Sequence, residues 1–300
     1  MRKFIAIVIV LLASAQLSLA TTKQQEKTNR QIFDKVYAAV RDKADLPTGE
    51  LALLIGKQFL GTEYVGFTLE VVPEDLQILL DKTDCILFVE MISSFALTVK
   101  GLKIEQAGDS EHFCVRHTPS VSKAEPSYEL LCDNIRNMRY RLGRIDGYGS
   151  RIHYTSEWIL QAQTNGLLEE ISKNLGEPMN QSFFYMTTHK NQYKQLLGDD
   201  EQTAVVRAAE DRLNRQVPYY YISQKLLCKP EIISQIKDGD IVTFVDSHPG
   251  LDLAHVAMAC TGEDGQMHFI HASLAKKKVV LESETLADYA TRGIRVCRLR

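Results

Sequence analysis

The sequence predicts an α+β protein whose helices precede an antiparallel sheet. Most segments before residue 214 carry apolar residues at helical spacing, as Ile32, Val36 and Val40 do near the start. The last third consists of short β-branched and apolar runs separated by Asp-Gly, Pro-Gly and Gly-Glu-Asp-Gly turns. Helices and strands that are segregated along the chain, without alternating one by one, favour α+β over α/β.

The expected helices share apolar residues that recur every three or four positions. They cover residues 23–44, 51–59, 84–99, about 126–140, 154–166, 167–175 and 200–213. One early strand is expected at 66–72, where the side chains alternate and several are β-branched. Four later strands, separated by turn residues that predict an antiparallel meander, are expected at 241–245, 255–260, 267–271 and 278–281.

The N-terminus has the three parts of a secretory signal peptide. Arg2 and Lys3 precede an apolar run over residues 4–13, and Ser18 and Ala20 are small residues at the −3 and −1 positions of a cleavage site. A membrane anchor is the alternative, but the run is shorter than the roughly 20 residues that a spanning helix needs. We therefore expect residues 1–20 to be removed on export across the inner membrane, which leaves a periplasmic protein without stable membrane association.

The charge and the length of the mature protein limit the classes of protein to which it can belong. Cleavage removes two basic residues and no acidic ones, so the formal charge goes from −3 to −5, with 33 basic against 38 acidic residues. Such a chain lacks the basic field that nucleic-acid binding requires, and we expect no nucleic-acid partner. Residues 21–300 are long enough for a single catalytic domain with an ordinary core, because 45% of the residues are hydrophobic.

Cys85 is the first candidate for a functional residue. It follows Thr83 and Asp84, either of which can cap the apolar helix that begins there. In the first turn of a helix, the macrodipole and the free backbone N–H groups lower the pKa of a thiol and can stabilise an oxyanion. Taken alone, the residue is more readily interpreted as a buried core cysteine on an apolar helix.

Two histidines in the C-terminal hairpin suggest a partner for this cysteine. His255 opens one expected strand and His271 closes the next. A three-residue loop over 262–264, closed by Thr261 opposite Gly265, would place the two imidazoles directly across from each other on one face. One imidazole can then take the thiol proton while the other orients it, which is the arrangement of cysteine hydrolases.

A metal site is the competing interpretation, since Cys85, His255 and His271 could together ligate zinc. The sequence has no His-Glu-x-x-His and no Cys-x-x-Cys motif to supply ligands at the usual spacings. We therefore expect neither a metal nor another cofactor.

Four segments resemble motifs of NlpC-like cell-wall cysteine peptidases, in the order of that superfamily. Asp-Cys-Ile-Leu-Phe-Val at 84–89 is similar to their Asp-Cys-Ser-Gly-Leu-Val, and Gly-Asp-Ile-Val-Thr-Phe at 239–244 is similar to their Gly-Asp-Leu-Val-x-Phe. Ala-His-Val-Ala-Met at 254–258 resembles their His-Val-Gly-Ile-Tyr, and Phe-Ile-His-Ala-Ser at 269–273 resembles the strand with their third polar residue. The resemblance implies a papain-like core, in which a helix bearing the nucleophile Cys85 packs on an antiparallel sheet bearing the base His255 and its orienting residue His271.

Two departures point to one branch of this superfamily. Ile86 and Leu87 replace the usual Ser-Gly, and 170 positions separate Cys85 from His255, more than twice what an ordinary member needs. The pattern resembles the N-acetylmuramoyl-L-alanine amidase-like branch of Bacteroides-type bacteria. That branch has an N-terminal helical region, here about 23–80, and a long insertion or lid, here about 100–235. It implies cleavage of the amide between N-acetylmuramic acid and L-alanine.

The insertion contains one segment that suits a glycopeptide ligand. Arg151, Tyr154, Glu157 and Trp158 combine the only Trp of the chain with charges of both signs. A ring can stack on a sugar while the polar ends bind carboxylates and hydroxyls. The alternative is a helix start with a hydroxyl cap, an acidic first turn and Trp158 in the core. A similar Tyr-x-Ser-acid-Trp run in the amidase-like branch favours substrate binding.

We therefore expect a secreted cysteine amidase that acts on muropeptides derived from peptidoglycan. Two alternatives stay open: an NlpC-type endopeptidase that cuts within the stem peptide, and a non-catalytic cell-wall-binding module with the same fold. A deep cleft formed by the insertion would favour small soluble fragments over the intact polymer.

Overall fold

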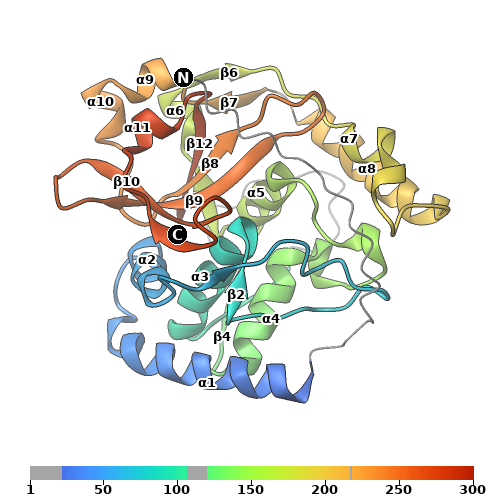
Figure 1. Ribbon diagram of the computed structural model, residues 1–300, viewed down its shortest axis with the longest axis horizontal. Helices are drawn as coiled ribbons and strands as arrows, with labels where there is room; N and C mark the ends of the chain where they lie inside the picture. Colours follow the sequence, from blue (N-terminus) through green and yellow to red (C-terminus); the bar gives the residue numbers. More distant parts are fainter. Residues whose placement is uncertain (1–21, 107–119, 217) are drawn as a thin grey trace.

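A computed structural model describes residues 22–106, 120–216 and 218–300, so the expected signal peptide lies outside the described residues. A layer of helices packs against one large sheet, and smaller elements surround the far edge of that sheet (Figure 1). The α+β class expected from the sequence is confirmed.

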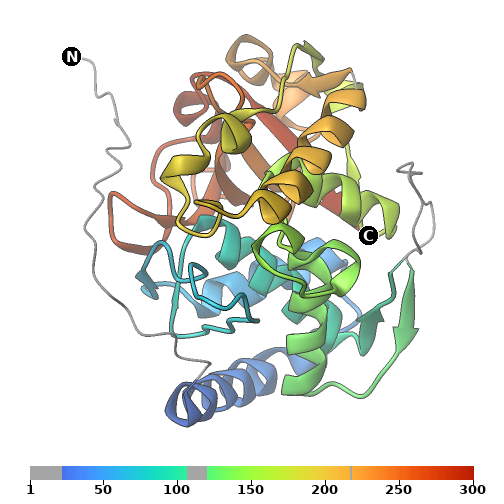
Figure 2. The ribbon, with the colours of Figure 1, turned by 90° about the vertical axis from the view of Figure 1, so that its right-hand side faces the viewer.

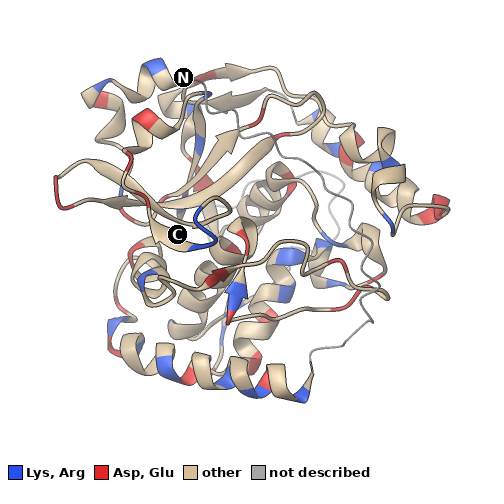
Figure 3. Cartoon of the chain, viewed as in Figure 1, with Lys and Arg blue, Asp and Glu red and all other residues tan. Residues whose placement is uncertain are grey.

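Four helices form the layer beneath the sheet, and each overlaps a predicted helix. They are α1 (Lys23–Val40), α2 (Thr48–Gln58), α3 (Cys85–Val99) and α4 (Tyr128–Arg139). α1 begins at a hydroxyl cap, since Thr22 Oγ1 accepts the Gln25 N–H at 3.1 Å. Acidic and basic residues are interspersed along it (Figure 3). α3 is buried from Leu87 to Val99 and is the central helix, packed between α2, α4 and the sheet (Figure 1).

The sheet has eight strands in the order β2-β1-β11-β10-β9-β8-β12-β5. Its strands, in chain order, are β1 (Glu63–Tyr64), β2 (Lys82–Thr83), β5 (Leu168–Glu170), β8 (Ile241–Val245), β9 (Leu253–Thr261), β10 (Met267–Ser273), β11 (Lys278–Leu281) and β12 (Ile294–Leu299). The run from β8 to β11 is antiparallel, so the predicted meander is confirmed. α3 packs directly on β9 and β10, which sets the first turn of the helix against the central strands.

The prediction of a strand at 66–72 is wrong. After β1, Val65 donates to Thr83 O at 2.9 Å, and the chain then turns away from the sheet. Phe67 has a φ of 61° and is 84% exposed, so its side chain does not pack on the sheet. Alternating side chains predict a strand only where a neighbouring strand is available to pair with them, and here none is adjacent.

The helix expected at 167–175 is also wrong over most of its length. α5 (Thr155–Thr164) ends before Gly166, whose φ is +69°, and residues 168–170 then form β5 at the edge of the sheet. β5 pairs antiparallel with β12, with Leu168 opposite Leu299. Only the short α6 (Ser172–Leu175) is helical, because pairing with a strand from the C-terminus overrides local propensity.

The remaining elements connect these layers. The short strands are β3 (Leu102–Ile104), β4 (Val121–Lys123), β6 (Glu177–Met179) and β7 (Tyr219–Tyr221). The remaining helices are α7 (Tyr185–Thr188), α8 (Asp200–Arg215), α9 (Gln224–Leu227), α10 (Pro230–Ile233) and α11 (Leu286–Tyr289). Single 3-10 turns are η1 (Arg41–Lys43), η2 (Arg141–Gly143), η3 (Tyr148–Ser150) and η4 (Lys190–Gln192).

The expected insertion at about 100–235 contributes to the core as well as to the periphery. α4 packs on α3, and Trp158 of α5 belongs to the main hydrophobic cluster. α7 and α8 cover a smaller cluster that includes Tyr154 and Phe183, and α8 lies over η3 (Figure 2). None of the helices in the described part of the chain is long and apolar enough to cross a membrane.

Candidate active site

Cys85 is the first residue of α3, and its partly buried side chain faces the start of β9. Asp84 caps the helix, since its Oδ1 accepts the Leu87 N–H at 2.9 Å. The Cys85 thiol lies against the backbone N–H of Val256, the residue that follows His255 in β9. The fold therefore brings the cysteine next to the strand that carries the first candidate histidine.

The surroundings of Cys85 favour the neutral thiol. Burial raises its pKa to about 12, and the neighbouring Asp84 carboxylate adds to the increase. The backbone N–H groups of Val256 and Ile86 act in the opposite direction but do not outweigh burial. The expectation that the helix N-terminus lowers the pKa of this thiol is therefore wrong, because loss of hydration outweighs the helix dipole.

His255 on β9 and His271 on β10 are in direct contact. His255 Nε2 lies 2.6 Å from His271 Nδ1, and the rings meet edge to face with centroids 4.9 Å apart. The hairpin loop lies one residue later along the chain than expected. Gly262 donates to Gln266 O, and Thr261 pairs with Met267, two positions beyond the expected partner. This two-residue change in register keeps both side chains on one face, since side-chain orientation alternates along a strand.

Glu282 completes a polar chain that sequence reasoning missed. Its Oε2 lies 3.3 Å from His271 Nε2, and its Oε1 accepts from Lys276 Nζ at 2.6 Å and from the Ser283 N–H at 2.9 Å. Burial alone would raise the pKa of Glu282, but these hydrogen bonds lower it to about 2. Glu282 could have been identified from the register of the β10–β11 hairpin. Ile270 pairs with Leu281, so the residue after Leu281 lies beside the strand that carries His271.

His255 is a neutral imidazole in an aromatic setting. Burial, followed by the charge of His271, lowers the pKa of His255 to about 3. Phe244 stacks on its ring at a centroid distance of 5.6 Å, and Tyr289 of α11 meets His271 edge-on at 6.2 Å. Burial raises the pKa of Tyr64, and the charge of a Cys85 thiolate would raise it further, so Tyr64 also lies near the thiol.

The four residues expected to bind substrate are all less than a tenth exposed. Tyr154 donates to Glu210 Oε1 at 2.8 Å, and Trp158 lies in the main core. Glu157 is held by Arg141 at 2.5 Å and by Arg212 at 3.0 Å. Within α5, Glu157 is in the first turn, as the helix-start interpretation expects. Their contact with substrate stays a prediction.

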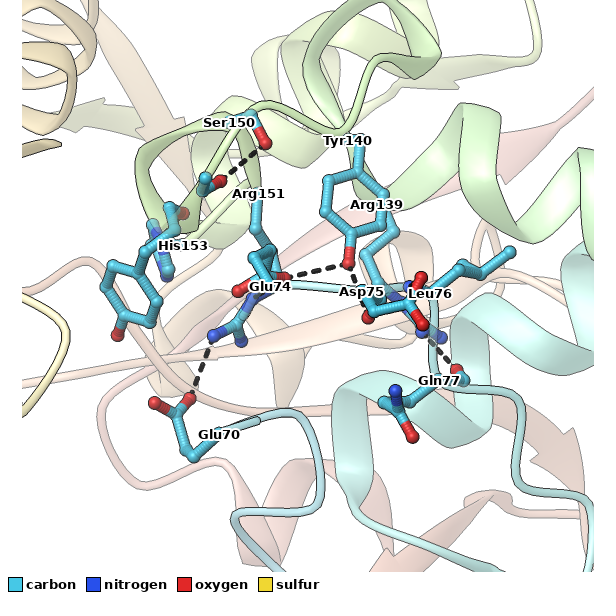
Figure 4. Close-up of polar contacts among 12 residues, drawn as sticks. Glu70, Glu74, Asp75, Leu76, Gln77, Arg139, Tyr140, Ser150, Arg151 and His153 are labelled. Atoms are coloured by element: carbon cyan, nitrogen blue, oxygen red, sulfur yellow. Dashed lines mark hydrogen bonds and ion pairs between the residues drawn. The ribbon is translucent and has the colours of Figure 1, made fainter. Parts of the chain in front are cut away.

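Arg151 ties the loop between β1 and β2 to the segment before α5. Its Nη2 lies 3.0 Å from Glu70 Oε1 (Figure 4), and its Nε lies 3.0 Å from Glu74 Oε1. Glu74 also accepts from the Tyr140 hydroxyl at 2.8 Å. Arg139, on the neighbouring α4, donates to the Gln77 carbonyl (Figure 4). These contacts connect α4 and the segment before α5 to the loop that starts just after Tyr64.

Among the described residues, no group of three or more His, Cys, Asp and Glu side chains is arranged to hold a metal ion. Cys85 on α3, His255 on β9 and His271 on β10 present a thiol followed by two imidazoles in sequence. Such a sequence is suited to transferring a proton from a thiol to a ring nitrogen.

Comparison with known proteins assigns the chain to a family. It belongs to the AmiA-like family, described as N-acetylmuramoyl-L-alanine amidase-like, which matches residues 54–294. A crystal structure of an N-acetylmuramoyl-L-alanine amidase from Bacteroides uniformis is similar, with 31% identity, a TM-score of 0.71, and coverage of 84% of this chain and 99% of that one. The family and this neighbour support a peptidoglycan amidase-like function, and hence a hydrolase.

Two further solved structures share the fold. A Bacteroides fragilis protein, provisionally named a xylanase, has 33% identity and a TM-score of 0.67, and covers 81% of this chain and 99% of that one. A Legionella pneumophila protein has 20% identity and a TM-score of 0.65, and covers 92% of this chain and 96% of that one. No curated protein matches this chain.

Proposed function

We propose that this chain is an exported cysteine amidase of the NlpC-like, papain-type superfamily, which hydrolyses the N-acetylmuramoyl–L-alanine amide of peptidoglycan fragments. The observation that carries the proposal is the juxtaposition of three groups: a cysteine at the first position of a central helix, beside the strand of His255, whose ring contacts His271 at 2.6 Å. A helix-borne nucleophile with an imidazole pair on an antiparallel sheet is what acyl transfer by a thiol requires.

In the proposed reaction, the neutral thiol of Cys85 attacks the lactyl carbonyl of the muramoyl group while His255 takes the thiol proton. A C–S bond forms, and the carbonyl oxygen becomes an oxyanion near the Cys85 backbone N–H, which has no carbonyl partner within its own helix. The C–N bond then breaks, and His255 returns the proton to the L-alanine nitrogen. Water hydrolyses the thioester and restores the thiol.

The buried residues of the 151–158 segment hold neighbouring parts of the fold through ion pairs. Arg151 orders the loop next to Tyr64, and Glu157 anchors α5 through two arginines. We propose that Arg151, Tyr154, Glu157 and Trp158 shape one wall of the substrate cleft. A cleft bounded by the insertion favours soluble muropeptides over intact sacculi, which comparison of the two digestion rates tests.

Mass spectrometry of muropeptides after incubation with the mature protein identifies the bond. Free muramic-acid saccharide together with the intact stem peptide supports the amidase. Cleavage inside the peptide would instead support the endopeptidase, and no cleavage across several wall types would support the binding module. Xylan is the negative control, because a similar structure carries a provisional xylanase name.

Export is tested separately. We propose that residues 1–20 are removed, because they combine a basic start, a short apolar run and a small-residue exit. N-terminal sequencing of the protein from the periplasmic fraction should start at Thr21. An intact Met1 on protein in the membrane fraction would contradict export with cleavage.

A further inference from the structure

We propose that Glu282 is a positioning residue that fixes the proton on Nε2 of both His271 and His255, and thereby leaves His255 Nδ1 as the proton acceptor for Cys85. This inference rests on the proposed cysteine mechanism and adds to it a residue outside the three that the motifs indicate. It follows from the contacts that connect Glu282, His271 and His255.

The first step concerns the carboxylate. Glu282 Oε1 accepts from Lys276 Nζ at 2.6 Å and from the Ser283 N–H at 2.9 Å, which holds the group in its ionised form. An ionised carboxylate can only accept hydrogen bonds. Because Oε2 of Glu282 lies 3.3 Å from His271 Nε2, the proton between them belongs on the ring nitrogen.

The second step follows from the chemistry of a neutral imidazole, which has one N–H donor and one acceptor nitrogen. When Nε2 of His271 carries the proton, its Nδ1 must accept. The partner of Nδ1, at 2.6 Å, is Nε2 of His255, which therefore donates. The remaining nitrogen of His255, Nδ1, is then unprotonated and can take the proton of a nucleophile.

Burial makes this relay depend on Glu282. His271 is 1% exposed and Glu282 is 7% exposed, so water cannot readily replace the carboxylate. The ionisable groups facing the relay come from several elements: His255 on β9, Lys276 from the β10–β11 turn, Tyr289 on α11 and Cys85 on α3. Among the described residues, it is Glu282 that lies within hydrogen-bond distance of His271 Nε2.

Nitrogen-15 NMR of the histidine side chains in the whole mature protein tests the inference without any substitution. The expected spectrum shows Nε2–H for both His255 and His271. A protonated Nδ1 on neutral His255 would overturn the proposal, whatever the activity.

Glu282→Gln tests the consequence for turnover. An amide can donate to His271 Nε2, so both tautomers should reverse, and kcat should fall on the order of 10³-fold with KM nearly unchanged. Glu284→Gln is the matched control, because it removes the same charge two residues away on an exposed side chain. Glu282→Asp, which keeps the carboxylate, should recover part of kcat and the wild-type tautomers.

Two outcomes would overturn the role of Glu282: wild-type tautomers and kcat in Glu282→Gln, or an equal loss of kcat in the control Glu284→Gln. Failure of the proposed mechanism gives a different result. Amidase activity that survives in Cys85→Ala would reject the cysteine mechanism, whereas an inactive Cys85→Ala with a fully active Glu282→Gln would reject only this inference.

Discussion

His255 Nε2 and His271 Nδ1 lie 2.6 Å apart across two neighbouring strands, with their rings at 78° to each other. This contact uses one of the two ring nitrogens of His255 and leaves the other to face a reacting group. The thiol of Cys85 lies against the next residue, Val256, so the first turn of α3 lies beside the same hairpin.

The neutral state of His255 predicts the acid side of the pH profile. Its pKa is lowered to about 3, so the base stays unprotonated throughout the weakly acidic range. We expect kcat to be flat from about pH 5 upward and to fall only near the lowered pKa. Steady-state kinetics from the acid limb to neutral pH check this expected pH dependence of kcat, with circular dichroism at each pH as a control for folding. A decline centred near the ordinary histidine pKa of about 6.5 would contradict this assignment.

The raised pKa of Cys85 predicts slow alkylation in the resting enzyme. Near neutral pH, iodoacetamide should modify Cys85 more slowly than the exposed Cys228, and the rate should keep rising above about pH 9. Asp84→Asn keeps a capping side chain but removes a negative charge beside the thiol, so alkylation should become faster. Peptide mapping by mass spectrometry measures both rates. Alkylation of wild-type Cys85 that reaches its plateau below pH 7 would mean a preformed thiolate.

The ion pair between Arg139 and Glu90 predicts a large loss of stability when one partner is removed. Arg139 Nε and Nη2 lie 2.8 and 2.6 Å from Glu90 Oε2, and both side chains are buried. Arg139→Met should lower the free energy of unfolding by about 3–5 kcal/mol, because it leaves a buried carboxylate without its cation. Urea denaturation measures the change. The double variant Arg139→Met, Glu90→Met should recover most of the lost free energy of unfolding. An equal loss in the single and the double variant would contradict the explanation.

Substitution of Trp158 distinguishes a supporting role of this side chain in the core from direct contact with the substrate. Its side chain is 3% exposed within the main core, so Trp158→Phe should lower the free energy of unfolding by about 1–3 kcal/mol. The KM of the folded variant should change less than about twofold. Thermal denaturation and kinetics on one muropeptide measure these quantities. Unchanged stability with a KM raised tenfold or more would instead indicate stacking on the sugar.

Local patterns were sufficient for the longer helices and for the meander. α3 is mostly apolar and follows an Asp cap. Glycine-containing turns separate β8 from β9 and β9 from β10. The hairpin argument brought His255 and His271 together although the loop was misplaced by one residue. Side-chain alternation tolerates a two-residue change in register, which explains why this contact was predictable.

The missed features depend on partners far away in the sequence. β5 is a strand because the C-terminal β12 pairs with it, and neither short segment shows this alone. Glu282 follows a strand end and becomes part of the site only through the register of a second hairpin. The pKa of Cys85 depends on how deeply tertiary packing buries the first turn of α3, which the cap sequence does not indicate.

The most direct test of the central claim compares release of L-alanyl peptide from a purified muropeptide by the wild type, Cys85→Ala and Cys132→Ala. Cys132 is a second free, partly buried cysteine on α4 and serves as the control for loss of a thiol. We predict that Cys85→Ala loses activity by at least about 10³-fold while remaining folded, and that Cys132→Ala keeps it. Activity retained by folded Cys85→Ala would contradict the account.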